Sequence, residues 1–329
     1  MISGLQERIF TIDSQQAFQD AALEIFEYQA ENNKVYRCFL QAINSNPRLI
    51  TDIKGIPFLP VEFFKSHKII TGNSKPDKVF ESSGTTGTSK SRHYVASAKL
   101  YEESLLRAFR IFYGDPSDYT IAALLPSYAE RENSSLIYMM KCIIEKSEDP
   151  FSGFFTDNID NMLSGIWKSI GKGRKAILIG VSYALLDLAE KYAPDLSGAI
   201  VMETGGMKGK RKEITRDELH SVLKQKLNVS AIHSEYGMTE LLSQAYSEGE
   251  GKFLCPPWMK ILIRDPRDPM SVLEGPCETG CINVIDLANI HSCSFIATSD
   301  LGKLNSDGSF EVLGRFDNSD IRGCNLLIE

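Results

Sequence analysis

The sequence predicts an α/β fold in which helices cover a largely parallel sheet and a smaller β-rich part follows. Short apolar runs such as KAILIGV (residues 175–181) indicate buried strands, and each precedes an amphipathic helical stretch such as residues 182–193. This alternation is typical of mixed or parallel sheets covered by helices. Beyond residue 250 the strand-like runs are instead separated by Asp, Pro and Gly turns, which predicts a β-rich subdomain.

The first part of the chain predicts a helical layer. Apolar side chains recur on one stripe through residues 14–45, which indicates a helix, and the prolines that follow break any continuation. We therefore expect a helical N-terminal layer at 1–72, an α/β core at 73–250 and the β-rich subdomain at 251–329.

The composition limits the classes of partner. A net charge of −7 over 329 residues argues against a nucleic-acid binder, which needs a basic surface. The start of the chain lacks the basic and apolar regions of a signal peptide. Since AILIGVSYALLDLA, the most apolar window, is too short for a bilayer, we expect no membrane span and a cytoplasmic protein.

Glycine and hydroxyl residues gather in ESSGTTGTSK, between the strand-like KVFE and a helical stretch. Gly84 and Gly87 allow positive φ and a close backbone approach, so that N–H groups can point at an anion. Lys90 adds a positive charge for phosphate oxygens. The hydroxyl donors are Ser82, Ser83, Thr85 and Thr86. The position suits a phosphate-binding loop, although the sequence is not G-x-x-x-x-G-K-[ST] and an ordinary polar loop explains it equally well.

A second candidate is YGMTE at residues 236–240, after the strand-like VSAI. Glu240 beside the Thr239 hydroxyl suits Mg²⁺, which takes one or two protein carboxylates together with substrate phosphates. Tyr236 offers a flat face to a purine ring. The alternative is a tight turn in which Thr239 caps a helix.

Two single residues complete the candidates. Asp300 follows a predicted strand in TSDLGKL, where a carboxylate is a usual partner for ribose hydroxyls and an equally usual turn residue. Near the end of the chain Arg322 precedes Cys324, and a neighbouring guanidinium favours the nucleophilic thiolate. A cysteine in such a position is more often a bystander. His93 and His233 lie beside the candidate segments, and we expect structural roles for both.

Taken in order, these segments resemble the motifs of the adenylate-forming superfamily, which joins carboxylic acids to AMP. The matching segments are residues 82–90, residues 236–240, Asp300 and the Gly-Arg-x-Asp sequence at 314–317. IPFLPVEFFKSHKI and TGGMKGKRKEITRDEL further resemble the LuxE type of acyl-protein synthetase, the fatty-acid-activating subunit of the bioluminescence fatty-acid reductase. The resemblance implies the N-terminal domain of the adenylate-forming fold, without the mobile C-terminal domain of acyl-CoA ligases.

The resemblance also implies roles for individual residues, with ATP and Mg²⁺ as cofactors and a small carboxylic acid, in particular a fatty acid, as substrate. Glu240 would hold Mg²⁺ and Thr239 would bind the α-phosphate, while residues 82–90 would line the β- and γ-phosphates. The implied nucleotide-binding residues are Gly205, Gly206, Tyr236, Gly237, Asp300 and Arg315. The acyl group would move to Cys324 and then to an acyl reductase or a carrier protein.

The resemblance is incomplete in places. Ser89 stands where the superfamily usually has proline, and Ser299 stands where it usually has glycine. Without the C-terminal domain another cation must neutralise charge at the α-phosphate. The candidates are Lys90, Arg92, Lys208 and Arg315.

Two other functions stay open. One is an acyl- or aryl-CoA ligase on a minimal scaffold, and the other is a non-catalytic nucleotide- or acyl-binding module. A decayed site should lose at least one of its polar residues, so the joint presence of Lys90, Thr239, Glu240 and Asp300 argues against the binding module.

Overall fold

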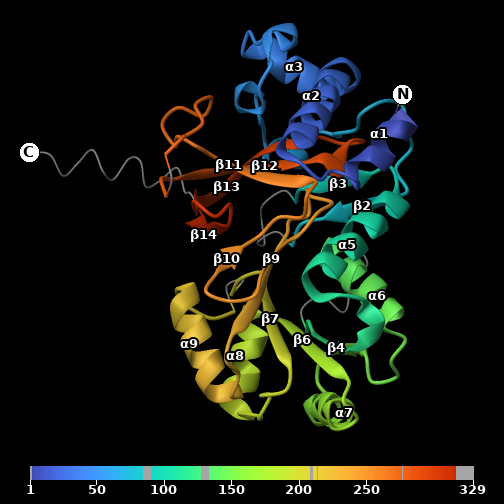
Figure 1. Cartoon of the computed structure of the whole chain (residues 1–329), viewed down its shortest axis with the longest axis vertical. Coiled ribbons are helices and arrows are strands. Elements are labelled where there is room, and N and C mark those ends of the chain that lie inside the picture. The colour runs from blue at the N-terminus through green and yellow to red at the C-terminus, as the bar shows by residue number, and fades with distance from the viewer. Residues whose placement is uncertain are drawn as a thin grey trace, which may run out of the picture. The chain divides into compact units, whose positions relative to one another are not determined.

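The computed structural model describes residues 2–83, 90–126, 133–207, 210–212, 214–275 and 277–315 (Figure 1). Contacts divide the chain into two compact units. The first unit comprises Met1–Val79, Ser91–Ala98 and Leu254–Glu329, and the second comprises Phe80–Lys90 and Lys99–Phe253. The helical N-terminal segment and the β-rich segment thus belong to one unit, whereas the boundaries predicted at residues 72 and 250 stay predictions.

The second unit is built on a sheet with strand order β5-β4-β6-β7-β8-β9, in which only the β8–β9 pair is antiparallel. Its strands are β4 (Tyr119–Leu124), β5 (Gly153–Phe155), β6 (Lys175–Val181), β7 (Ile200–Thr204), β8 (Ile232–Tyr236) and β9 (Ala245–Ser247). Its helices are α5 (Ala98–Tyr113), α6 (Ser135–Ser147), α7 (Ile159–Gly171), α8 (Ser182–Lys191) and α9 (Arg216–Leu227), with the 3-10 turn η3 (Pro116–Asp118). The predicted α/β fold with a largely parallel sheet is confirmed.

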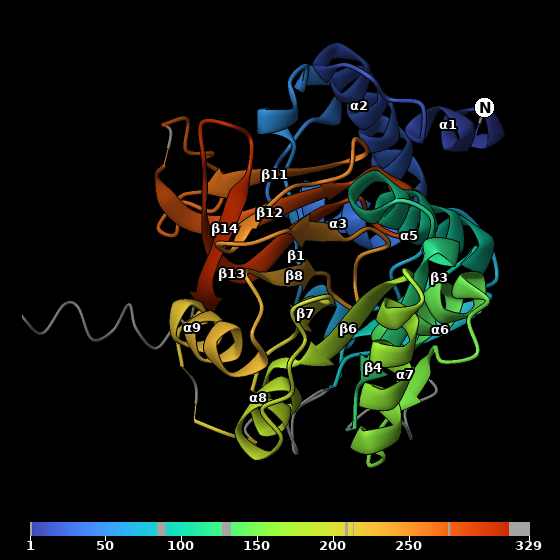
Figure 2. The same cartoon turned by 60° about the horizontal axis from the view of Figure 1, so that its bottom comes forward.

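Helices cover both faces of this sheet (Figure 2). The side chains that alternate along β4 identify which helix covers which face. Thr120 Oγ1 donates to Ser169 Oγ of α7 at 2.7 Å. The next residue, Ile121, faces the other side, where it lines one cavity together with Phe109 of α5 and Met139 of α6. Helix α7 therefore covers one face, and α5 and α6 cover the other.

The first unit contains an antiparallel sheet in the order β14-β13-β12-β11, with the short β1 parallel to β13. These strands are β1 (Leu59–Pro60), β11 (Met259–Arg264), β12 (Thr279–Asp286), β13 (Phe295–Leu304) and β14 (Phe310–Arg315). The helices are α1 (Ile2–Ile9), α2 (Gln15–Asn32), α3 (Lys34–Ala42) and α4 (Phe63–Ser66), and the 3-10 turns are η1 (Pro47–Leu49), η2 (Ile53–Gly55) and η4 (Leu287–Asn289). The remaining strands are β2 (Lys78–Glu81) and β3 (Arg92–Val95), which pair, and β10 (Lys252–Phe253), which ends the second unit.

Helix α2 is tied to this sheet by aromatic packing and by a buried glutamine. The rings of Phe26 and Phe295 lie 5.9 Å apart. Gln29 Nε2 donates to the carbonyl of Ile290 at 3.0 Å, and its Oε1 accepts the N–H of Ser294 at 2.9 Å. None of the helices in the described part of the chain has the length and apolar character needed to cross a bilayer.

The single helix predicted over residues 14–45 is wrong, because Asn33 separates α2 from α3. Asn33 adopts an extended backbone and its side chain accepts the N–H of Tyr36, which caps α3. Its Nδ2 donates to the carbonyl of Ser292 at 2.7 Å. A tertiary contact with a distant loop thus ends a helix that the local apolar pattern would continue.

Candidate active site

The carboxyl ends of β7 and β8 bring two predicted site segments together. Thr204 and Glu235 are register partners in this parallel pair. Gly205 and Gly206, which follow β7, therefore lie at the same edge of the sheet as Tyr236 and the residues after it. Strand β8 continues to Tyr236, so this tyrosine is both the last residue of the strand and the first residue of the segment that follows it.

Residues 236–240, called the 236–240 turn from here on, present polar groups at this edge. Gly237 is exposed, Thr239 is half-buried and Glu240 is 5% exposed. The chain continues from the turn to β9 without a helix within this described stretch, so the alternative in which Thr239 caps a helix is wrong. Gln244, beside the turn, is buried and its Oε1 has no hydrogen-bond partner among the described residues. A buried acceptor therefore stays open next to Gly237.

Residues 82–90 are called the 82–90 loop from here on. Only its two ends, residues 82–83 and residue 90, lie within the described residues. Gly84, Thr85, Thr86 and Gly87 lie outside them. Ser82 and Ser83 are half-buried after β2, and Lys90 is exposed with its Nζ 3.5 Å from the Glu81 carboxylate. The N–H of Glu81 donates to the carbonyl of Asn133 at 2.9 Å, just before α6 begins. Because the helix after a parallel strand begins at the carboxyl edge of the sheet, the loop begins at the same edge as the 236–240 turn.

Asp300 and Arg315 lie in the first unit, as register partners on β13 and β14. Arg315 Nε is 3.7 Å from Asp300 Oδ1, and the Asp300 side chain is 14% exposed against 87% for Arg315. The prediction that Asp300 follows a strand is wrong, since β13 continues to Leu304. Lys208 and Cys324 lie outside the described residues.

A buried polar cluster beneath the loop after β7 was missed by sequence reasoning. The carboxylate of Glu203, which is 4% exposed, lies 3.3 Å from Arg216 Nε and 3.8 Å from His220 Nε2. Ser182 Oγ lies 3.2 Å from the same carboxylate and 2.9 Å from the carbonyl of Gly205. Burial acts to raise the pKa of Glu203, but His220 and Arg216 outweigh it and hold this pKa below its ordinary value. An ionised Glu203 thus links Ser182 of α8 and Arg216 of α9 beneath the Gly205 loop, a name used here for Gly205 and Gly206.

Glu235 lies on the opposite face of the sheet, because it stands one residue away from Ser234, the register partner of Glu203. Thr204 Oγ1 donates to Glu235 Oε2 at 2.6 Å. Burial raises the pKa of Glu235 to about 7, with the Thr204 hydrogen bond lowering it and the charge of Glu203 raising it. This carboxyl therefore titrates near neutral pH at the entry to the 236–240 turn. The available signal was an acidic residue at the fourth position of each of two neighbouring five-residue strands, in IVMET and IHSEY.

The close approach of Glu235 to the 236–240 turn makes a testable prediction about Gly237. A Cβ at position 237 would lie 2.4 Å from Glu235 Oε1, whereas no atom lies within 4 Å of a Cβ at Gly206. We expect Gly237→Ala to lower the free energy of unfolding by about 1–3 kcal/mol, because the Glu235 carboxylate must shift to make room while its other oxygen is held by Thr204. Urea unfolding of Gly237→Ala and of Gly206→Ala, the matched control, measures the difference.

The cause can be separated with a double variant. If Glu235 is the obstacle, Gly237→Ala combined with Glu235→Ala loses less stability than the sum of the two single variants. Strict additivity would show that the alanine is disfavoured for another reason.

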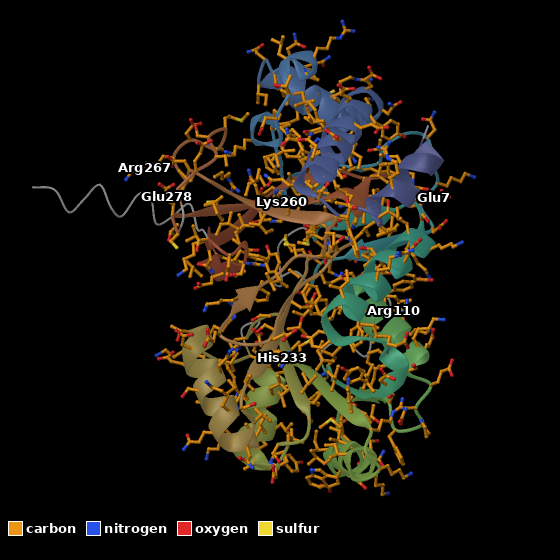
Figure 3. All side chains as sticks on the ribbon, in the orientation of Figure 1. Glu7, Arg110, His233, Lys260, Arg267 and Glu278 are labelled. Atoms are coloured by element: carbon orange, nitrogen blue, oxygen red, sulfur yellow. The ribbon has the colours of Figure 1, made fainter. Side chains whose placement is uncertain are left out.

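The histidines beside the candidate segments make hydrogen bonds inside their units, and their structural roles stay predictions. His93 is buried in the first unit with its Nε2 3.0 Å from Asn289 Oδ1. His233 of β8, labelled in Figure 3, has its Nδ1 3.2 Å from the Tyr113 hydroxyl. Burial lowers the pKa of His233, which keeps the ring neutral at physiological pH.

A metal ion at this edge would need ligands from the bound substrate as well as from the protein. Within the described ranges no group of three His, Cys, Asp or Glu side chains is placed to hold a metal ion. The 236–240 turn offers one carboxylate, that of Glu240. One carboxylate completed by phosphate oxygens and water is a usual Mg²⁺ arrangement, so the residues present fit this ion.

Comparison with known proteins finds structures with a similar fold but no sequence match. No family model and no curated protein match the sequence. Among solved structures, 2-hydroxyisobutyryl-CoA ligase in complex with 2-HIB-AMP and CoA matches with a TM-score of 0.68 and 14% identity, over 93% of this chain and 77% of the other. ATP-bound MatB from Rhodopseudomonas palustris matches with a TM-score of 0.55 and 17% identity, over 74% and 49%. A long-chain-fatty-acid–CoA ligase from Archaeoglobus fulgidus matches with a TM-score of 0.53 and 15% identity, over 76% and 53%.

The present chain spans about half the length of the latter two proteins. At these identities the likeness concerns the fold alone. The chain has the α/β fold of the N-terminal domain of adenylate-forming enzymes.

Proposed function

We propose that this protein activates a carboxylic acid with ATP, as an acyl-adenylate. A carboxylate oxygen of the acid attacks the α-phosphorus of ATP, and the bond from that phosphorus to the bridging oxygen breaks to release pyrophosphate. The main support is the meeting of the Gly205 loop, the 236–240 turn and the start of the 82–90 loop at one carboxyl edge of a parallel sheet. Ligands of open α/β sheets bind at this edge.

The residues at this edge fit a nucleotide. Gly205 and Gly206 are exposed, so their backbone is open to a bound group. The unpartnered Gln244 Oε1 is an acceptor for the N–H groups that a nucleotide base carries. In this proposal Tyr236 covers the adenine and Thr239 donates to the α-phosphate. Asp300 accepts from the ribose hydroxyls with Arg315 beside it, as the superfamily resemblance implies.

Charge at the phosphates would be balanced by a cation held by Glu240 and by the ammonium group of Lys90. Glu240 supplies a carboxylate to Mg²⁺, which when bound neutralises charge on the phosphate oxygens. Lys90 is exposed at the end of the 82–90 loop and its Glu81 contact is long, so its ammonium group can move to a phosphate. The hydroxyl and N–H donors of the 82–90 loop would line the β- and γ-phosphates.

The second step we propose is transfer of the acyl group to Cys324, as in the LuxE type of acyl-protein synthetase. The Cys324 thiolate attacks the carbonyl carbon of the mixed anhydride, a thioester forms, and AMP leaves with the electrons of the broken C–O bond. The thioester then passes the acyl group to an acyl reductase or a carrier protein. A fatty acid is the substrate that this resemblance favours.

Coenzyme A is the second candidate acceptor. The favouring observation is the similarity of the fold to a CoA ligase bound to an acyl-adenylate and CoA. In that case Cys324 has no part in the reaction, so the two candidates make opposite predictions for a cysteine variant.

The proposal is tested by ATP–pyrophosphate exchange across a panel of carboxylic acids, followed by labelling. We expect exchange with at least one acid, and a hydroxylamine-sensitive acyl-enzyme from that labelled acid and ATP. Cys324→Ser should retain exchange and lose the label, with the exposed Cys38→Ser as the matched control. Labelling that survives Cys324→Ser identifies another acceptor. Product formation only with CoA supports the CoA ligase. Absence of exchange with every acid supports a non-catalytic binding module.

A further inference from the structure

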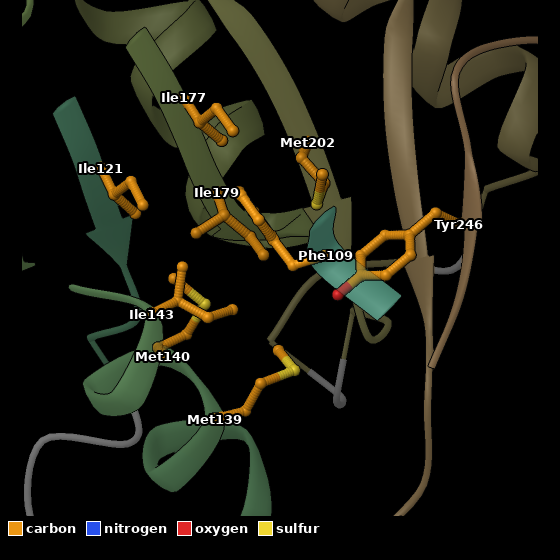
Figure 4. Close-up of a pocket in the computed structure, with 9 residues that line it drawn as sticks. All are labelled: Phe109, Ile121, Met139, Met140, Ile143, Ile177, Ile179, Met202 and Tyr246. Carbon is orange, nitrogen blue, oxygen red and sulfur yellow. The ribbon is translucent and has the colours of Figure 1, made fainter. Parts of the chain in front are cut away.

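The second unit contains a small apolar cavity on one face of its sheet (Figure 4). Its volume is about 10 Å³. The lining residues are Phe109, Ile121, Met139, Met140, Ile143, Ile177, Ile179, Met202 and Tyr246. Methionine side chains are unbranched and adapt their shape, so this lining can open around a guest molecule more readily than a wall of branched residues.

The one polar group of this lining has no partner. Tyr246 is 2% exposed, and its hydroxyl makes no hydrogen bond to any described residue. Figure 4 shows this hydroxyl pointing toward Phe109 and the space between the lining side chains. Burial raises the pKa of Tyr246 well above its ordinary value, so the hydroxyl keeps its proton and can donate.

A trapped water does not account for this hydroxyl. A cavity of about 10 Å³ is at the lower limit for one water molecule, and a buried water requires roughly two to four polar partners. Here the other lining residues are apolar. A buried donor that stays unpaired in the free protein costs stability, which a ligand that carries an acceptor would restore.

The cavity lies on the face of the sheet that leads to the 236–240 turn. Met202 and Thr204 share this face because they are two residues apart on β7. Thr204 is the register partner of Glu235 on β8, and Glu235 is the register partner of Tyr246 on β9. The register therefore places Tyr246 next to Glu235 on the face of the sheet that ends at the 236–240 turn.

We propose that the cavity receives the apolar end of the carboxylic acid and that Tyr246 selects acids that carry an oxygen acceptor, a hydroxyl or a keto oxygen, on that end. This inference rests on the proposed function and makes Tyr246 a specificity-determining residue. An unsubstituted acyl chain for which this lining opens leaves the Tyr246 donor unpaired. A site built to hydrogen-bond a substrate group discriminates strongly against the analogue that lacks it.

The test compares matched acids in ATP–pyrophosphate exchange. The probes are straight-chain acids from butanoic to dodecanoic, each beside its ω-hydroxy and its penultimate-keto counterpart. For the wild-type protein we expect the best oxygenated acid to exceed its unsubstituted counterpart in kcat/KM by about tenfold or more. Tyr246→Phe should bring this ratio close to one.

Tyr113→Phe is the matched control, because Tyr113 is a buried neighbour of Tyr246 whose hydroxyl already has a partner in His233. We expect this control to leave the ratio unchanged and to lower Tm, whereas Tyr246→Phe loses no internal hydrogen bond and keeps Tm at least at the wild-type value. Exchange with the same ratio in the wild type and Tyr246→Phe, or a wild-type preference for unsubstituted acids, overturns the inference alone. Absence of exchange with every acid overturns the proposed function, and the inference with it.

Discussion

We expect Glu240→Gln to reduce ATP–pyrophosphate exchange by about 100-fold or more. Glu240 is 5% exposed, at the end of a turn that borders the Gly205 loop. Glutamine keeps the size of the side chain but replaces a charged oxygen ligand by a neutral amide, which binds a hard cation such as Mg²⁺ less well. Exchange measured over a range of Mg²⁺ concentrations should show both a lower maximum and a higher half-saturating concentration.

The matched control is Glu250→Gln, which removes an exposed carboxylate that pairs with Lys252 at 2.8 Å. We expect exchange at the wild-type rate and an unchanged Tm for this control, and the Tm of Glu240→Gln shows that the variant is folded at the assay temperature. Full activity of a folded Glu240→Gln protein would falsify the role of Glu240 as the cation ligand.

The second large effect concerns stability. We expect Glu203→Gln to lower the free energy of unfolding by about 3 kcal/mol at pH 7, because it leaves the guanidinium of Arg216 without its buried anion. The Glu203 side chain is 5% exposed and its carboxylate is 3.3 Å from Arg216 Nε. Glu190 and Arg211 form a shorter contact of 2.8 Å, but the Glu190 side chain is 49% exposed. Glu190→Gln should therefore cost less than about 1 kcal/mol in urea unfolding.

The difference between Glu203→Gln and the wild type should also depend on pH. The folded-state pKa of Glu203 lies below its ordinary value of 4.5. The stability that the ionised carboxylate contributes is therefore present above pH 4.5 and lost as the pH falls through the folded-state pKa. Unfolding curves of the two proteins should converge at acidic pH. A gap that stays constant down to pH 3 would show that packing, rather than charge, sets the effect.

The regular elements of the second unit were predictable because their signals are local. The run at residues 175–181 is apolar throughout and forms β6, which is buried between two helical layers, and the amphipathic stretch after it forms α8. The capping sequence before α9 is similarly local, since Thr215 and Glu218 form a capping box within one turn. Short-range patterns of this kind need no knowledge of the rest of the chain.

Other features depended on contacts that no local pattern contains. Asn33 ends a helix because its amide binds the carbonyl of Ser292, which lies far along the chain. Asp300 lies inside a strand rather than after one because β14 continues to pair with β13 as far as Arg315. These two errors have one cause, since strand and helix ends were set by partners that are distant in sequence.

Composition, hydrophobic periodicity and the order of polar segments were enough to predict the α/β class and to name Tyr236, Thr239 and Glu240 as candidates, because these signals lie within a few neighbouring residues. Only the tertiary structure related Glu203 to Arg216, Glu235 to Gly237 and the Tyr246 hydroxyl to an apolar cavity. The physical reason is that burial and the lack of a hydrogen-bond partner belong to a side chain's surroundings, and segments far apart in the sequence build those surroundings.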